Sequence, residues 1–161
     1  RLLHFRLSEF FNIKANPSLV IDGIEPRLNQ MALPLLSLVD DPSLRRDVSE
    51  MLTEQNADTW EERRESTEGR VLAAALSAIA EGQKKPVAVR DVAARFNAEH
   101  CADYEGPVTN RWIGYMLRTR LSVRTRKSNG IYVVDPTEYK KLVAVAHRYG
   151  LSIDLSRIAA E

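Results

Sequence analysis

The sequence predicts a mainly α-helical fold with one small β-hairpin, in which a helical N-terminal part precedes a C-terminal domain. Two observations support this prediction. Apolar residues recur every three or four positions over residues 28–39, 44–52 and 71–79, which is the spacing of amphipathic helices. Near the C-terminal end, the dipeptide Asn129-Gly130 separates two short runs of residues that favour strands, and this dipeptide favours the tight turn of a hairpin.

The N-terminal part begins with residues 1–7 (RLLHFRL), which we expect to form a short strand. The first helix should begin near Glu25 and continue to about Val39, with Pro26 in its first turn, where a missing backbone donor costs little. Pro34 should bend or divide this helix, because its ring removes one backbone hydrogen bond.

A second helix should begin at Asp41-Pro42-Ser43, where a capping residue precedes a proline at the first helical position. Its apolar stripe ends near residue 52, and residues 56–65 are mostly charged or polar. We expect this stretch to be a solvated helix that links two domains. The predicted domains are residues 1–65, a helical segment with its linker, and residues 66–161.

The second domain shows a different order of elements. We expect a helix capped by Ser66, a short extended segment, two further helices, a hairpin and a final helix; their ranges are 66–82, 86–89, 91–99, 108–118, 123–133 and 136–149. This order is typical of a winged helix-turn-helix, in which the third helix and the hairpin, or wing, contact DNA.

Charge is unevenly distributed along a chain whose net charge is only +1. Residues 40–68 contain ten acidic residues and four arginines, a balance of −6. Residues 110–130 contain six basic residues and no acidic one, a balance of +6. Because the basic residues fall on the third helix and the hairpin, they predict a surface that binds nucleic acid.

The predicted surface combines the start of the third helix with the basic side chains that follow it. On a helical wheel, Arg111 and Arg118 lie opposite the apolar side, and Arg124 and Arg126 should share one strand face. A charged but merely solvated surface, or a winged helix that binds another protein, would show a similar pattern. The candidate nucleic-acid-binding residues are Thr109, Asn110, Arg111, Arg118, Arg120, Arg124, Arg126 and Lys127.

Other function classes find little support in the sequence. Cys101 is the only cysteine, which excludes an intramolecular disulfide and favours the cytoplasm. The chain contains no GxxxxGK[ST] phosphate-binding loop, no zinc-ligand spacing, no nucleophile elbow and no apolar run long enough to cross a membrane. We therefore expect no cofactor and no metal in this chain and assign no catalytic residue.

Two stretches resemble known families. VAVRDVAARFN and VTNRWIGYMLR resemble the winged-helix superfamily, and EPRLNQMALPLLSLVDDPSLRRDVSEML is similar to the helical lid after the motor core of AAA+ helicases. Minichromosome-maintenance-like helicases of phages and mobile genetic elements share this layout of motor, helical lid and winged helix. The resemblance implies that residues 1–7 are the last strand of a motor core, that residues 24–55 are its lid, and that the chain is part of a longer protein.

The expected function is therefore that of a DNA-binding region in a replication or mobile-element helicase. Its partners would be duplex or forked DNA and neighbouring subunits of a helicase ring. Two alternatives fit the same pattern: a protein-interaction module whose winged helix docks on a partner protein or a neighbouring subunit, and a transcriptional regulator whose N-terminal helices serve dimerisation or sensing. Whether the protein is an enzyme depends on a motor upstream of Arg1.

Overall fold

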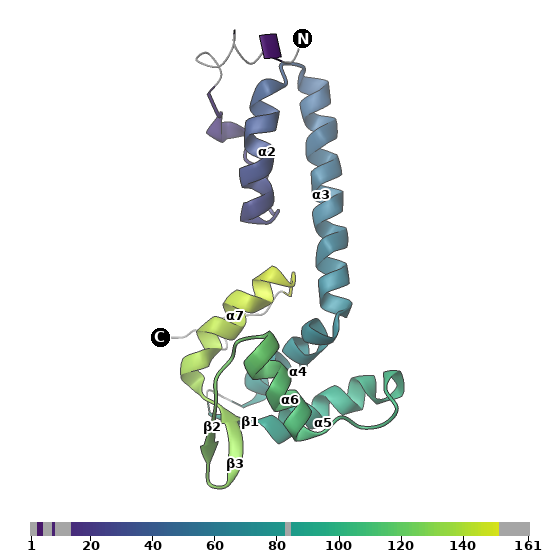
Figure 1. Ribbon diagram of the computed structural model, residues 1–161, viewed down its shortest axis with the longest axis vertical. Helices are drawn as coiled ribbons and strands as arrows, with labels where there is room; N and C mark the ends of the chain where they lie inside the picture. Colours follow the sequence, from purple (N-terminus) through teal and green to yellow (C-terminus); the bar gives the residue numbers. More distant parts are fainter. Residues whose placement is uncertain (1–2, 5–7, 9–13, 83–84, 152–161) are drawn as a thin grey trace. The chain divides into compact units, whose positions relative to one another are not determined.

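The chain is mainly helical, as expected, and contains a small antiparallel sheet in which a third strand joins the expected hairpin. The computed structural model describes residues 3–4, 8, 14–82 and 85–151 (Figure 1). The chain divides into two compact units, Arg1–Thr59 and Trp60–Glu161. Of the expected strand at residues 1–7, only Leu3 and His4 lie within the described part, and both are helical.

The first unit is built from a 3₁₀ turn and two helices. The turn is η1 (Pro17–Leu19), and the helices are α2 (Pro26–Leu38) and α3 (Pro42–Glu65), which continues past Thr59 into the second unit. Pro26 occupies the first turn of α2, as predicted. Pro34 lies inside α2 without dividing it, because it is exposed and the carbonyl that loses its donor can bond to water.

One buried polar side chain ties the two helices of this unit together. The Oδ1 atom of Asn56 accepts a hydrogen bond of 3.0 Å from the backbone N–H of Glu25, which precedes α2. Asn56 is only 4% exposed, so this bond satisfies a group that would otherwise be costly to bury. The stretch 56–65 is helical, as the sequence predicts, and Asn56 gives it a packing role inside the unit.

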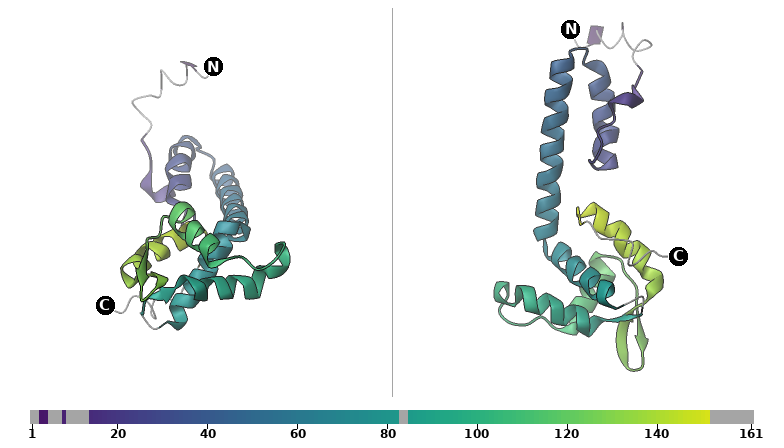
Figure 2. Two further views of the ribbon diagram at one scale, coloured as in Figure 1. Left: turned by 60° about the horizontal axis from the view of Figure 1, so that its bottom comes forward. Right: turned by 180° about the vertical axis from the view of Figure 1, so that it is seen from behind.

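The second unit follows the predicted order of helix, strand, helix, helix, strand, strand and helix (Figure 2). The helices are α4 (Thr67–Glu81), α5 (Val89–His100), α6 (Asn110–Tyr115) and α7 (Tyr139–Arg148), with 3₁₀ turns at η2 (Cys101–Asp103) and η4 (Pro136–Glu138). The strands are β1 (Val87–Ala88), β2 (Thr125–Ser128) and β3 (Ile131–Val134).

The sheet has the order β1-β3-β2, and both strand pairs are antiparallel. Asn129 and Gly130 connect β2 to β3 with φ angles of 48° and 82°, the left-handed values that a two-residue hairpin turn needs. The tip of this hairpin extends away from the helices of the unit (Figures 1 and 2). In the register, Lys127 lies opposite Tyr132, so their side chains share one face of the hairpin.

The core of the second unit gathers side chains from all its helices. Its fully buried members include Leu72 of α4, Phe96 of α5, Ile113 of α6 and Leu142 of α7. Phe96 is also the centre of an aromatic cluster, 5.6 Å from the ring of Trp112. The apolar side of α6 therefore holds it to the domain, as the helical wheel predicts.

The junction between α3 and α4 is tight. The Oγ atom of Ser66 caps α4 by accepting a hydrogen bond of 3.1 Å from Gly69 N–H, as expected for this serine. A Cβ atom on Gly69 would lie 2.2 Å from the carbonyl oxygen of Arg63. At the other end of the unit, the backbone of Gly150 lies against the ring of Trp60, so α3 also contacts the end of α7.

Candidate nucleic-acid interface

The loop before α6 is held by one side chain of α5. Asn97 donates from Nδ2 to the carbonyl oxygen of Val108 (3.0 Å) and accepts from Val108 N–H (2.7 Å). Thr109 then caps α6, because its Oγ1 atom accepts a hydrogen bond of 3.2 Å from Trp112 N–H. These bonds fix where the helix begins.

The third helix is shorter than the predicted range 108–118. The regular part, α6, ends at Tyr115 and is followed by a π-helical turn, Met116–Arg120, in which Leu121 N–H bonds to the carbonyl oxygen of Met116 (3.1 Å). Arg118 and Arg120 therefore belong to this turn. Leu117 and Leu121 are both buried, and their packing favours this uncommon geometry over a regular helix end.

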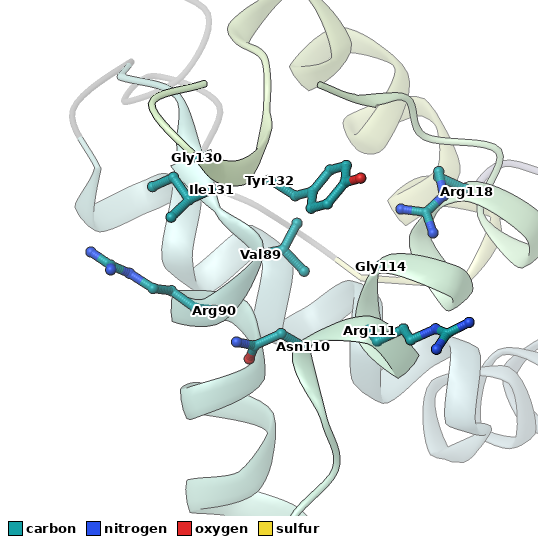
Figure 3. A pocket seen from close by; sticks show the side chains of 9 residues that line it. All are labelled: Val89, Arg90, Asn110, Arg111, Gly114, Arg118, Gly130, Ile131 and Tyr132. Carbon is teal, nitrogen blue, oxygen red and sulfur yellow. The ribbon is translucent and has the colours of Figure 1, made fainter. Parts of the chain in front are cut away.

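A groove of about 500 Å³ lies between these helices and the hairpin (Figure 3). The helices and the π turn contribute Val89, Arg90, Asn110, Arg111, Gly114 and Arg118 to its lining. The hairpin contributes Gly130, Ile131 and Tyr132. The lining thus includes three arginines and no acidic residue, so the groove suits an anionic ligand.

Arg118 joins the helical side of the groove to the hairpin. Its Nη1 atom donates a hydrogen bond of 3.1 Å to Oγ1 of Thr125 in β2. Its guanidinium also lies over Gly114, where an added Cβ would come within 3.0 Å of the same nitrogen. The space left by the glycine is therefore occupied by Arg118, which fixes a cation in the groove with other N–H groups still available.

The hairpin has two faces of different charge. Thr125, Lys127 and Tyr132 share the face that meets Arg118. Arg126 lies on the other face, where its Nε is 2.6 Å from Oδ2 of Asp135. The hydrogen bond from Arg126, together with one from the backbone of residue 137, holds the pKa of the Asp135 carboxyl below its usual value.

The structure brings some of the predicted residues together and separates others. Asn110, Arg111 and Arg118 line the groove, and Lys127 lies beside Tyr132 at its edge. Thr109 lies at the start of α6, where its hydroxyl serves as the cap.

Like Thr109 and Lys127, the remaining three candidates are not part of the groove lining. Arg120 Nε is 3.6 Å from Oε1 of Glu68 in α4, and Arg126 is paired with Asp135. The side chain of Arg124 is exposed and makes no ion pair with the described residues, while its backbone N–H donates to Oε2 of Glu138 (3.1 Å). Of the six basic side chains in residues 110–130, two are thus paired with carboxylates that lie outside this stretch.

Arg90 and Tyr132 are among the groove residues that the sequence analysis did not identify. Arg90 lies at the start of α5, outside the basic stretch, and no local pattern indicated its position. Tyr132 lies in β3, and the hairpin register was the available signal, since it places this ring opposite Lys127.

No protein family model, curated protein or solved structure matches this chain. Among the described residues, no helix is long and apolar enough to cross a membrane. The same part of the chain contains no group of three or more His, Cys, Asp or Glu side chains that could hold a metal ion.

Proposed function

We propose that the second unit is a winged-helix domain that binds DNA through the groove between α6 and the hairpin. In this proposal α4, α5 and α6 are the three helices of the fold, and β2 with β3 is the wing. The order of elements and the β1-β3-β2 sheet support this assignment, because the wing then follows directly from the recognition helix.

The observation that carries the proposal is the charge of the groove. Arg90, Arg111 and Arg118 line it, and Lys127 flanks it on the same hairpin face as Tyr132. Within the described part of the chain, Arg90 is the one of these four that forms an ion pair, with its Nε 3.5 Å from Oδ1 of the adjacent Asp91. Four cations that meet phosphates would give a log–log dependence of affinity on salt with a slope of about −3 to −4.

The test is fluorescence anisotropy of labelled duplex, forked and single-stranded DNA across a salt series. The decisive variant combines Arg111→Glu with Lys127→Glu, because neither side chain makes an ion pair with the described residues. Lys140→Glu is the matched control, since it changes the charge of an exposed α7 residue away from the groove. We expect the double variant to lose at least about tenfold in affinity, and the control to stay close to wild type. Equal affinity of the double variant and wild type would refute this surface.

We further infer that the protein belongs to a replication or mobile-element AAA+ helicase, with the first unit as the lid. The support is the sequence resemblance of residues 24–55. A GxxxxGK[ST] motif upstream of Arg1 in the full gene would support this inference. A gene that begins close to Arg1, combined with a dimer that binds one palindromic site, would favour a transcriptional regulator instead.

A contact with another protein has one specific observation in its favour. Met31, Leu35 and Met51 of the first unit are 63%, 62% and 55% exposed. Large apolar side chains that are exposed on α2 and α3 suit a contact with a protein partner. In the helicase proposal, this partner is a neighbouring subunit of the ring.

A further inference from the structure

We propose that the groove holds an unpaired nucleotide of a DNA strand, with its base stacked on the ring of Tyr132 and its phosphates bound by the arginines. This inference deepens the proposed function and depends on it. It specifies the form of DNA as a single strand or a fork with unpaired bases. The basic charge of the groove alone does not distinguish this form from duplex DNA.

The position of Tyr132 is the first argument. Its side chain is 54% exposed, although it is a large ring in a strand. Figure 3 shows the ring standing in the groove between Ile131 and Arg118, with its hydroxyl toward Arg118. The Tyr139 hydroxyl, in contrast, donates to the carbonyl oxygen of Lys85, and that ring is 5% exposed. Tyr132 therefore offers a flat apolar surface that the fold itself does not use.

The division of the groove into two kinds of surface is the second argument. Its apolar part consists of Val89, Ile131 and Tyr132, and its cationic part of Arg90, Arg111 and Arg118. A nucleotide has the matching parts, a planar base and an anionic phosphate. The volume of about 500 Å³ lies in the range of sites that enclose small organic groups.

Whether the bases are paired determines which form of DNA can bind to both the apolar and the cationic part of the groove. In a duplex, each base face is covered by its neighbours in the stack, so a tyrosine ring gains little contact with it. An unpaired base exposes both its faces and its pairing edge. The side-chain amide of Asn110, which also lines the groove, supplies donors and an acceptor for that edge. Stacking of aromatic side chains on unpaired bases tolerates any sequence, because every base has such a face.

The experiment compares two tyrosines in a binding assay. Anisotropy is measured with a labelled thymidine oligonucleotide, an abasic strand of equal length, a duplex and a free mononucleotide competitor. The variants are Tyr132→Ala and Tyr132→Phe, and the control is Tyr115→Ala, which removes a ring of similar exposure (49%) that does not line the groove. Circular dichroism of each variant checks that the domain is folded.

We expect Tyr132→Ala to lower affinity for the thymidine strand by at least about fivefold. Its affinity for duplex and for the abasic strand should change by less than about twofold, since neither presents an unpaired base. Tyr132→Phe and Tyr115→Ala should bind like wild type, because the first keeps the ring and the second leaves the groove intact.

Three results would overturn the inference. In the first, Tyr132→Ala binds the thymidine strand as wild type does. In the second, it loses duplex and single-strand binding equally, which would make the ring a packing residue. In the third, a free mononucleotide competes as well as the oligonucleotide, which would make the groove a nucleotide site. If strand binding is lost in the Arg111→Glu, Lys127→Glu variant but not in Tyr132→Ala, this inference fails while the DNA-binding proposal stands.

Discussion

For the substitution Gly69→Ala, helix propensity predicts a gain in stability, whereas packing predicts a loss. Gly69 lies in the first turn of α4, and alanine is normally the more stable residue in a helix by about 1 kcal/mol. The added Cβ, however, would lie 2.2 Å from the carbonyl oxygen of Arg63 and 2.5 Å from that of Arg64. Both opposing atoms belong to the backbone, so no side-chain rotation can relieve the overlap.

The expected size of the effect follows from these distances. Ordinary contacts of a Cβ atom begin near 3.4 Å, so α3 and α4 must separate by roughly 1 Å at their junction. Overpacking of this kind costs about 3 kcal/mol at the upper end of its usual range. After the gain of about 1 kcal/mol in helix propensity, the net loss is about 2 kcal/mol. For a unit of roughly 100 residues, this lowers the melting temperature by about 10 °C.

The assay is thermal unfolding followed by tryptophan fluorescence and by circular dichroism. Gly106→Ala is the matched control, because a Cβ there would meet nothing within 4 Å. It should leave the melting temperature unchanged or slightly higher, since alanine restricts the unfolded chain. A Gly69→Ala variant as stable as wild type, or more stable, would show that the junction between α3 and α4 is not as tight as described.

Three further substitutions test the hairpin and the core. Asp135→Asn removes the partner of Arg126, which lies on the hairpin face away from the groove, so DNA affinity and the salt slope should stay close to wild type; a slope steeper by about 0.9 in the anisotropy assay would show that Arg126 also contacts DNA. Gly130→Ala places a side chain at a φ of 82° and should destabilise the second unit by about 1 kcal/mol in urea unfolding, whereas no loss would mean that the turn adopts another form. Burial raises the pKa of Tyr139 to about 12, whereas a tyrosine in an unfolded chain has a pKa of about 10. The free energy of unfolding should therefore fall as the pH rises from about 10 to about 12. The Tyr139→Phe variant should not show this fall, and the same pH profile for both proteins would refute the prediction.

Local signals in the sequence were sufficient to predict most of the helices and strands. Ser66 and Gly82 bound α4, and Asn129-Gly130 makes the hairpin turn, because each of these residues acts on the backbone next to it. The end of the third helix was predicted less well. Its π turn depends on the burial of Leu121 and on a hydrogen bond of 2.7 Å from Val123 N–H to the carbonyl oxygen of Leu117, which arise only in the folded domain.

The candidate site was predicted only in part, because some of its contacts also form only in the folded domain. The basic stretch identified Arg111, Arg118 and Lys127, which lie at the groove, because charge can be counted along the chain. It did not show that Glu68 approaches Arg120, since 52 positions separate these residues in the sequence and only packing of α4 brings them together. Arg111, Arg118 and Lys127, together with Arg90 of α5, are the cations for which DNA contact is proposed.

The division of the chain into two units has a spectroscopic consequence. Both tryptophans and all five tyrosines lie between Trp60 and Tyr149, whereas residues 1–59 contain neither type. Ultraviolet absorbance near 280 nm and intrinsic fluorescence therefore arise from the second unit alone, and Trp60 contributes at the very start of that unit. Far-ultraviolet circular dichroism reports on the helices of both units. Without any label, a melting curve that differs between the two signals would reveal whether α2 and the first part of α3 unfold separately from the rest of the protein.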